Sequence, residues 1–158
     1  MRFGAGIWLF GQFVDRYATD AYGPAVSTIE AIERAGAVGD LEVLDINYPF
    51  SDPDITVEEV LRALETNRLS TWCITPHIYT KQFRGGAFTN PDPDVRRRAI
   101  ELCEEAVDVA RRLGAPTVKL WPGQDGFDYP LQADYGELWR LAVDGVSTVA
   151  AMDPAVRV

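Results

Sequence analysis

Residues 116–129, PTVKLWPGQDGFDY, join a short β-branched run to a polar and aromatic loop. The run favours a strand at Thr117–Leu120. The loop after it carries an indole, glycines, an amide, carboxylates and a phenol, groups that suit a polyhydroxylated ligand. A helical pattern ends before this stretch at Gly114, and another begins after it at Asp134. The stretch therefore reads as the strand and loop of one βα unit.

Strands and helices alternate in the same order along the rest of the chain. Thr56 and Glu59 form the pattern of a capping box, and Asp92 with Pro93 is a strong helix start. Such alternation implies a parallel sheet with right-handed crossovers. The expected strands are Phe3–Phe10, Leu41–Asn47, Ser70–Ile78 and Thr117–Leu120, with a fifth beginning at Val156; the expected helices are Ser27–Ala35, one from Thr56, one from Asp92 to Gly114, and Asp134–Ala150.

The chain length limits the architecture. At 158 residues it forms one domain, but it is about 100 residues short of a closed eight-unit barrel. We expect an α/β fold, a parallel (β/α) half-barrel made of the first four βα units. Residues 1–158 would be a single N-terminal half, cut at the start of the fifth strand. An open doubly wound sheet is the alternative, although no Gly-rich phosphate loop follows the first strand.

Composition excludes several classes of partner. The net charge of −9 argues against nucleic acid and anionic membranes. The basic run Arg96–Arg98 lies beside Glu101, Glu104 and Glu105, which predicts a solvated, salt-bridged helix face. The sequence has no run of 18 apolar residues and no signal-peptide pattern, so we expect a cytoplasmic protein. Cys73 and Cys103 are expected to be buried, reduced thiols.

The ends of the expected strands carry the candidate site. The carboxyl ends of parallel strands share one edge of a sheet, where ligands bind. Aromatic rings pack against the C–H face of a sugar, and amides and carboxylates bind its hydroxyls. Alternatively, the aromatic residues only cap the core. The candidate sugar-binding residues are Trp8, Phe10, Asn47, Tyr79, Phe88, Trp121, Gln124 and Asp125, and Asp45, Tyr48 and Lys119 lie at the same strand ends.

His77 is the one histidine of the chain and lies at a strand end. It is the candidate catalytic residue, either as an acid/base near neutral pH or as a hydrogen-bond donor to a substrate oxygen. A structural histidine in a loop is the alternative. The histidine has no neighbouring carboxylate at the spacing of a metal site, so no metal ligand is assigned in this chain.

Four motifs, TPHIYT (75–80), GGAFTN (85–90), DVRR (94–97) and WPGQDG (121–126), resemble the xylose isomerase-like TIM barrel superfamily. The resemblance implies that Trp8, Tyr79 and Trp121 are walls of a sugar pocket. Asn47 stands where xylose isomerase has the histidine that binds the sugar ring oxygen. His77, on the neighbouring unit, is the candidate to replace that histidine.

The resemblance also implies an activity: a sugar isomerase (aldose–ketose) or a sugar epimerase that depends on Mn, Mg or Co. The family's metal ligands come from strands five to eight, so the 158-residue chain alone is expected to be inactive. The alternative is a non-catalytic half-barrel that binds sugar or needs a partner chain to close. Unpaired sheet edges predict a homo-oligomer or a missing C-terminal half. An endonuclease IV relative is disfavoured by the single histidine and the charge.

Overall fold

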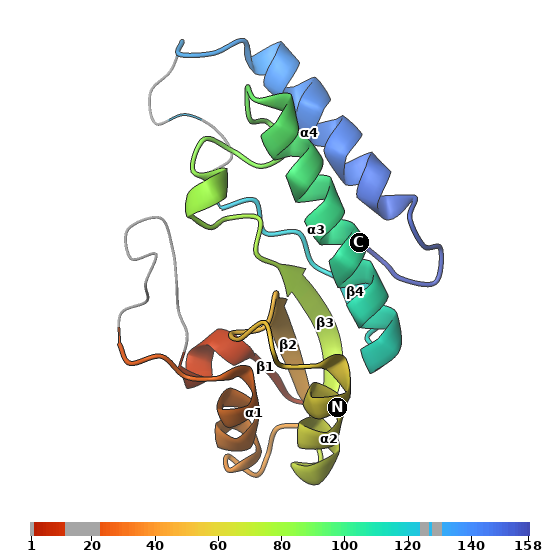
Figure 1. Cartoon of the computed structure of the whole chain (residues 1–158). Helices are drawn as coiled ribbons and strands as arrows, with labels where there is room; N and C mark the ends of the chain where they lie inside the picture. The colour runs from red at the N-terminus through yellow and green to blue at the C-terminus, as the bar shows by residue number, and fades with distance from the viewer. Residues whose placement is uncertain (1, 12–22, 124–126, 128–130) are drawn as a thin grey trace.

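A computed structural model of the chain describes residues 2–11, 23–123, 127 and 131–158. Its described elements alternate between strand and helix, as the sequence predicts (Figure 1). In chain order they are β1 (Gly4–Gly6), η1 (Ile7–Phe10), α1 (Thr28–Gly36), β2 (Val43–Tyr48), α2 (Val57–Thr66), β3 (Ser70–Pro76), η2 (Lys81–Phe83), α3 (Pro93–Leu113), β4 (Thr117–Val118) and α4 (Tyr135–Ala150), where η marks a short 3-10 helix.

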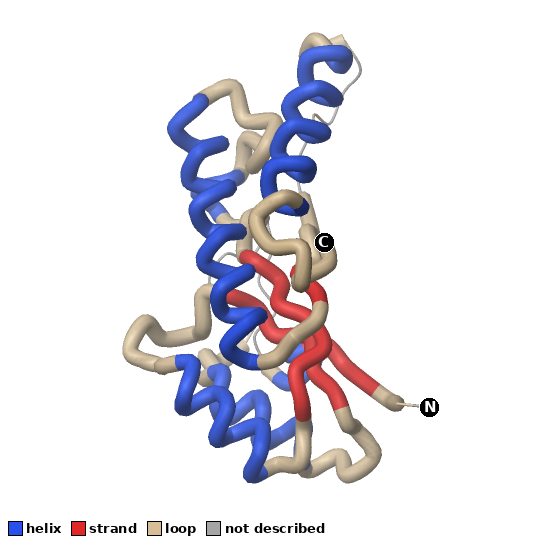
Figure 2. The backbone as a smooth tube through the Cα atoms, turned by 90° about the vertical axis from the view of Figure 1, so that its right-hand side faces the viewer, coloured by secondary structure: helices blue, strands red, loops and turns tan. Residues whose placement is uncertain are grey.

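The four strands form one parallel sheet in the order β1-β2-β3-β4. Each strand therefore pairs with the next one along the chain, as consecutive right-handed βα units require. Figure 2 shows the strands side by side with the helices packed beside them. The predicted α/β class with a parallel sheet is confirmed.

One face of the sheet packs against the helices and forms the main core. Leu44, Ile46, Ile74 and Val118 are fully buried on this face, in one apolar cluster with residues of α1, α2 and α3. Side chains alternate between the two faces of a strand. The residues between these positions, including Asp45 of β2, therefore lie on the opposite side, which we call the inner face.

A second apolar cluster lies where α3 packs beside α4. It contains Ile78, Phe83, Phe88, Leu102 and Cys103, among others. Both cysteines are free and buried, Cys73 in β3 and Cys103 in α3. Within the part of the chain that the structure describes, no helix is long and apolar enough to cross a membrane.

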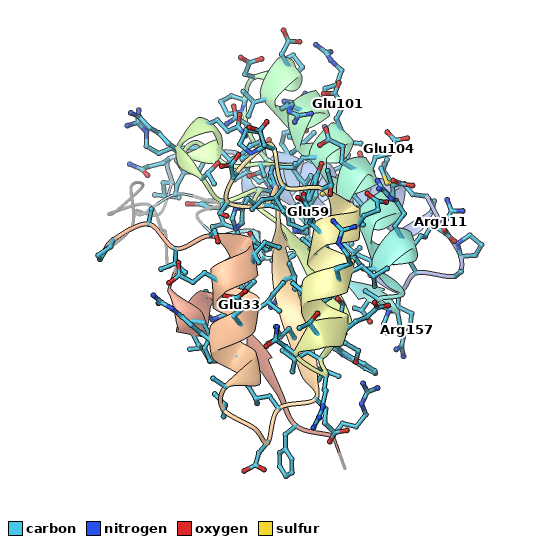
Figure 3. The ribbon with its side chains drawn as sticks, turned by 60° about the horizontal axis from the view of Figure 1, so that its bottom comes forward. Glu33, Glu59, Glu101, Glu104, Arg111 and Arg157 are labelled. Atoms are coloured by element: carbon cyan, nitrogen blue, oxygen red, sulfur yellow. The ribbon has the colours of Figure 1, made fainter. Side chains whose placement is uncertain are left out.

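The outward faces of the helices carry charged side chains, among them Glu101 and Glu104 of α3 (Figure 3). Arg98 pairs with Glu101 at 3.3 Å and with Glu105 at 2.8 Å, and Arg97 pairs with Asp94. The predicted salt-bridged face of α3 is therefore confirmed.

The local helix signals behave as predicted. Ser27 caps α1, and Thr56 with Glu59 forms the complete capping box of α2. Asp92 caps α3, which ends at Gly114 in the left-handed conformation with φ +70°. That conformation costs a residue with a Cβ more than it costs glycine.

All four strands are shorter than predicted. The second begins at Val43 instead of Leu41, and the third ends at Pro76 instead of Ile78. The first and fourth differ most. The first ends at Gly6, because Ile7–Phe10 forms the 3-10 turn η1 instead of extended chain. The fourth has only Thr117 and Val118 in the strand. Beyond Val156, Arg157 makes an isolated parallel bridge with Thr117, so a fifth strand is represented by a single bridge.

Candidate functional site

Four side chains meet on the inner face: Trp8 of η1, Asp45 of β2, Thr75 of β3 and Lys119 after β4. We call them the inner-face cluster. The Thr75 hydroxyl donates to Asp45 Oδ1 at 2.7 Å, and the Lys119 ammonium pairs with Asp45 Oδ2. Lys119 Nζ also lies 4.4 Å from the centroid of the Trp8 ring, a cation–π distance. Strands β2 and β3, the residue that follows β4, and η1 thus contribute to one cluster.

The backbone at Gly6 makes room for Trp8. A Cβ at Gly6 would lie 2.1 Å from a carbon of the Trp8 ring, so the indole folds back over the end of β1. This contact fixes the ring beside Lys119.

Asn47 and Tyr79 form a second contact near the inner face. The Asn47 amide donates to the Tyr79 hydroxyl at 3.1 Å. Gly123 packs on Tyr79, because a Cβ there would lie 2.5 Å from the Tyr79 Cβ. Gly123 has φ +63°, which again suits glycine. The structure therefore brings two of the predicted sugar-binding residues together and folds the loop after β4 against them.

His77 lies next to this pair but in a buried environment. Its ring packs edge-on against Tyr79 at 5.2 Å, and its Nε2 atom has no hydrogen-bond partner in the described structure. His77 and Asn47 both line a small cavity of about 30 Å³, together with Ser27, Thr28 and Ser51. The Asn47 Oδ1 atom is also buried without a partner. A polar cavity of this size suits an ordered water.

Burial lowers the pKa of His77 to about 4. An imidazole with this pKa is neutral at pH 7, since desolvation disfavours its charged form. The expectation that His77 exchanges protons near neutral pH needs correction for this structure. A neutral imidazole still donates or accepts a hydrogen bond, which was the second predicted role.

The charge of the Asp45 carboxylate contributes to a raised pKa at Tyr79. Burial and the Asp45 charge together raise the pKa of Tyr79 to about 12. Tyr79 is therefore a neutral phenol at physiological pH. The site that the described residues form contains one ion pair and otherwise neutral polar groups, and hydroxyl groups of a sugar are suitable partners for it.

Three other predicted residues do not join the inner-face cluster. Phe10 packs against the main core, and Phe88 is buried in the second cluster, where Gly145 of α4 lies against its ring. Trp121 is 60% exposed. Phe88 is 4% exposed, and it also lines the groove between α4 and the segment after β4, so its sugar contact stays a prediction. Gln124 and Asp125 lie outside the described residues.

The described residues do not fit a bound metal. No three His, Cys, Asp or Glu side chains among them gather closely enough to hold an ion. Both oxygens of Asp45, the carboxylate of the site, are already bonded to Thr75 and Lys119. No catalytic step through a metal is therefore assigned to these residues.

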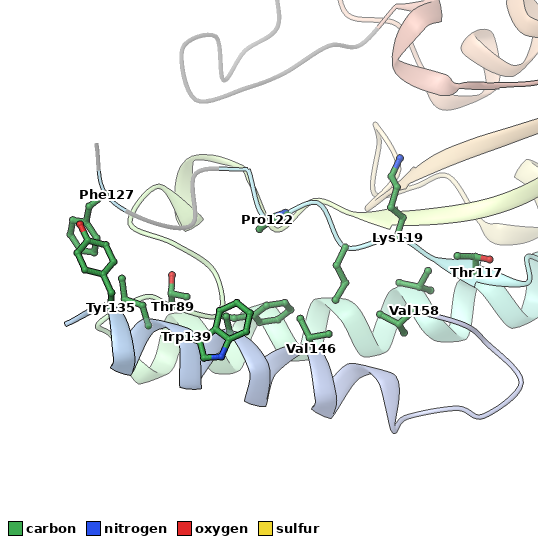
Figure 4. Close-up of a pocket in the computed structure, with 14 residues that line it drawn as sticks. Thr89, Thr117, Lys119, Pro122, Phe127, Tyr135, Trp139, Val146 and Val158 are labelled. Carbon is green, nitrogen blue, oxygen red and sulfur yellow. The ribbon is translucent and has the colours of Figure 1, made fainter. Parts of the chain in front are cut away.

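An apolar groove runs between the segment after β4 and α4, and we call it the α4 groove. It has a volume of about 950 Å³. Trp139 and Val146 of α4 point into it, whereas the Lys119 ammonium points away toward the inner face (Figure 4). Tyr135, Trp139, Val143 and Val146 recur at helical spacing and are 48%, 73%, 42% and 43% exposed. This apolar stripe lies on the side of α4 that α3 does not cover.

Sequence reasoning undervalued three members of the inner-face cluster. Asp45 and Lys119 were noted at strand ends without a role, and Thr75 was named in a motif only. The available signal was the alternation Leu44-Asp45-Ile46-Asn47, which places polar residues on one face of a strand whose other face is apolar.

The fold agrees with one family. A family profile described as xylose isomerase-like TIM barrel matches residues 29–158, and the chain belongs to this family. Xylose isomerase from Thermus thermophilus is 26% identical over 162 residues, which cover 95% of this chain and 41% of that protein.

Solved structures give the same fold. D-psicose 3-epimerase with D-tagatose from Clostridium cellulolyticum H10 has a TM-score of 0.64 at 20% identity, covering 96% of this chain and 48% of that one. D-allulose 3-epimerase from Methylomonas sp., in complex with D-allulose, has a TM-score of 0.65 at 17% identity, covering 96% and 47%. The chain spans about half the length of these relatives, so its four βα units correspond to half of a TIM barrel.

Proposed function

We propose that this chain is the sugar-binding half of a cytoplasmic sugar isomerase (aldose–ketose) or sugar epimerase. The inner-face cluster carries the proposal, because it gathers an ion pair and an indole on the face of the sheet that the helices do not cover. Asn47, His77 and Tyr79 add neutral polar groups at the neighbouring strand ends. In this proposal they orient sugar hydroxyls, and His77 acts as a neutral hydrogen-bonding group.

The proposed enzyme depends on a divalent metal (Mn, Mg or Co) whose ligands lie outside these 158 residues. When bound, such an ion would polarise sugar oxygens. In an isomerase this assists transfer of hydrogen between C1 and C2, whereas in an epimerase a proton leaves one carbon and returns to the opposite face of the same carbon. The support is the family membership.

A binding measurement tests the proposed sugar-binding role, and a turnover assay tests the proposed position of the metal ligands. Saturation-transfer NMR with D-xylose, D-tagatose and D-allulose should detect weak binding to the 158-residue chain, with Kd on the order of millimolar because half of the pocket is missing. Isomerase and epimerase assays with Mn²⁺, Mg²⁺ or Co²⁺ should give no turnover. Binding of none of these sugars would contradict the sugar-binding role, and clear turnover would contradict the placement of the metal ligands.

A non-catalytic half-barrel that needs a partner is the second candidate, and the α4 groove favours it. Monomeric proteins seldom expose a continuous apolar patch of this kind. We propose that the second half of a barrel fills this groove. Its first strand would continue from the β4 edge, where Val118 N–H donates to Arg157 O at 2.8 Å and Arg157 N–H donates to Pro116 O at 3.0 Å.

The oligomeric state tests the groove. In isolation, two copies of the chain should cover each other's grooves, so light scattering should give a mass above 17.5 kDa. Trp139→Ser should weaken this association, whereas the control Val38→Ser, which changes a 54% exposed residue away from α4, should not. A monodisperse wild-type monomer would contradict the groove as an interface. An intact mass near twice 17.5 kDa from the native source would identify a longer chain as the occupant.

A further inference from the structure

We propose that the Asp45–Lys119 pair selects uncharged sugars and rejects phosphorylated or carboxylated ones. The inference rests on the proposed function and names the substrate class of the same site. It assigns a specificity role to two residues through the contacts that they make with each other and with Trp8.

The charge of Lys119 is already compensated. Its ammonium pairs with Asp45 Oδ2, and the other Asp45 oxygen accepts from Thr75 at 2.7 Å. The Lys119 side chain is 39% exposed and that of Asp45 is 16% exposed, so the lysine is the more accessible member of the pair. An ammonium has three N–H donors. Lys119 therefore presents donors to a ligand without presenting a free positive charge.

Trp8 strengthens this arrangement. The ammonium lies over one face of the indole, 4.4 Å from the ring centroid. A ligand on this face of the indole meets the lysine donors first. Trp8 and Lys119 would then contact the ligand together.

The two ligand classes respond differently to such a pair. A sugar hydroxyl accepts an N–H bond from Lys119 while the ion pair stays intact. A phosphate or carboxylate gains little from a compensated ammonium and lies within a few ångströms of the Asp45 charge, which repels it. The net charge of −9 adds to the repulsion at low salt.

The test compares the affinity of the 158-residue chain for D-fructose with its affinity for D-fructose 6-phosphate. Binding is followed by the NMR signal of the Trp8 indole N–H, which is identified by its loss in the Trp8→Phe variant. The wild type should bind fructose at least about 10-fold more tightly than the phosphate. Asp45→Asn, which frees the lysine charge, should shift this ratio by about 10-fold toward the phosphate. Lys119→Met, which removes the donors and keeps the aliphatic stem, should lower the affinity for fructose by about 10-fold.

Equal or tighter binding of the phosphate by the wild type would overturn the inference, as would an unchanged ratio in Asp45→Asn. If neither sugar moves the Trp8 signal, the saturation-transfer experiment with D-xylose, D-tagatose and D-allulose decides the proposed function, and inorganic phosphate decides the inference alone. A response to phosphate in Asp45→Asn that is absent from the wild type supports charge compensation. An equal response in both proteins refutes it.

Discussion

The single histidine of this chain makes its stability depend on pH in a predictable way. In the unfolded chain His77 takes up a proton near pH 6.5, but in the folded chain burial lowers its pKa to about 4. Between these values the unfolded state binds more protons than the folded state, so the free energy of unfolding decreases as the pH falls. At about 1.4 kcal/mol per unit, the full loss is on the order of 3 kcal/mol, of which about 2 kcal/mol is reached by about pH 5.

Urea unfolding followed by circular dichroism measures this loss for the wild type and His77→Gln at about pH 7.5 and about pH 5. Carboxylates titrate in both proteins, so the difference between the two pH dependences isolates His77. The wild type should lose about 2 kcal/mol more than the variant. An NMR titration of the one histidine Cε1–H gives the pKa directly. Parallel pH dependences, or a midpoint near 6.5, would refute the buried placement of the ring.

Two further changes test packing and capping. Gly145→Ala places a Cβ 2.6 Å from the Phe88 ring and should lower the free energy of unfolding by about 1–3 kcal/mol. The matched control is Gly136→Ala in the first turn of the same helix, where the new Cβ would lie 3.2 Å from the Asp134 carboxylate. This control should leave the free energy of unfolding unchanged or raise it by up to about 1 kcal/mol. Equal effects of the two substitutions in urea unfolding would contradict the packing of α4 against Phe88. Thr56→Ala removes the capping box of α2 and should cost about 1 kcal/mol in thermal unfolding, whereas Thr56→Ser should stay close to wild type; a stable Thr56→Ala variant would mean that the cap contributes little.

The sequence predicted most of the fold because its signals are local. A capping box, a Pro at the first helical position and a terminal glycine each act within a few residues, and each was found where the sequence placed it. The strand ends were less predictable. Ile7–Phe10 has the apolar residues of a strand, yet the indole of Trp8 folds back over Gly6, and this contact depends on three-dimensional packing.

The sequence predicted where the candidate site lies in the fold, but it did not predict which side chains contact one another there. Strand alternation places Asp45 on the inner face, but its partner Lys119 is 74 residues away and meets it only through the register of three strands. Burial is equally non-local. His77 stands at a strand end, as predicted, and its low pKa follows from neighbours contributed by separate βα units.

The two buried cysteines give the folded chain a pair of built-in reporters of local opening. Burial raises the pKa of Cys73 to about 11, with a contribution from Asp45, and the pKa of Cys103 to about 12. A thiol reacts with alkylating reagents as its thiolate, so at neutral pH both are protected until the surrounding structure opens. Cys73 lies in the sheet and Cys103 in the α3 layer. Their separate labelling rates would therefore show whether the sheet and the α3–α4 layer open together or independently.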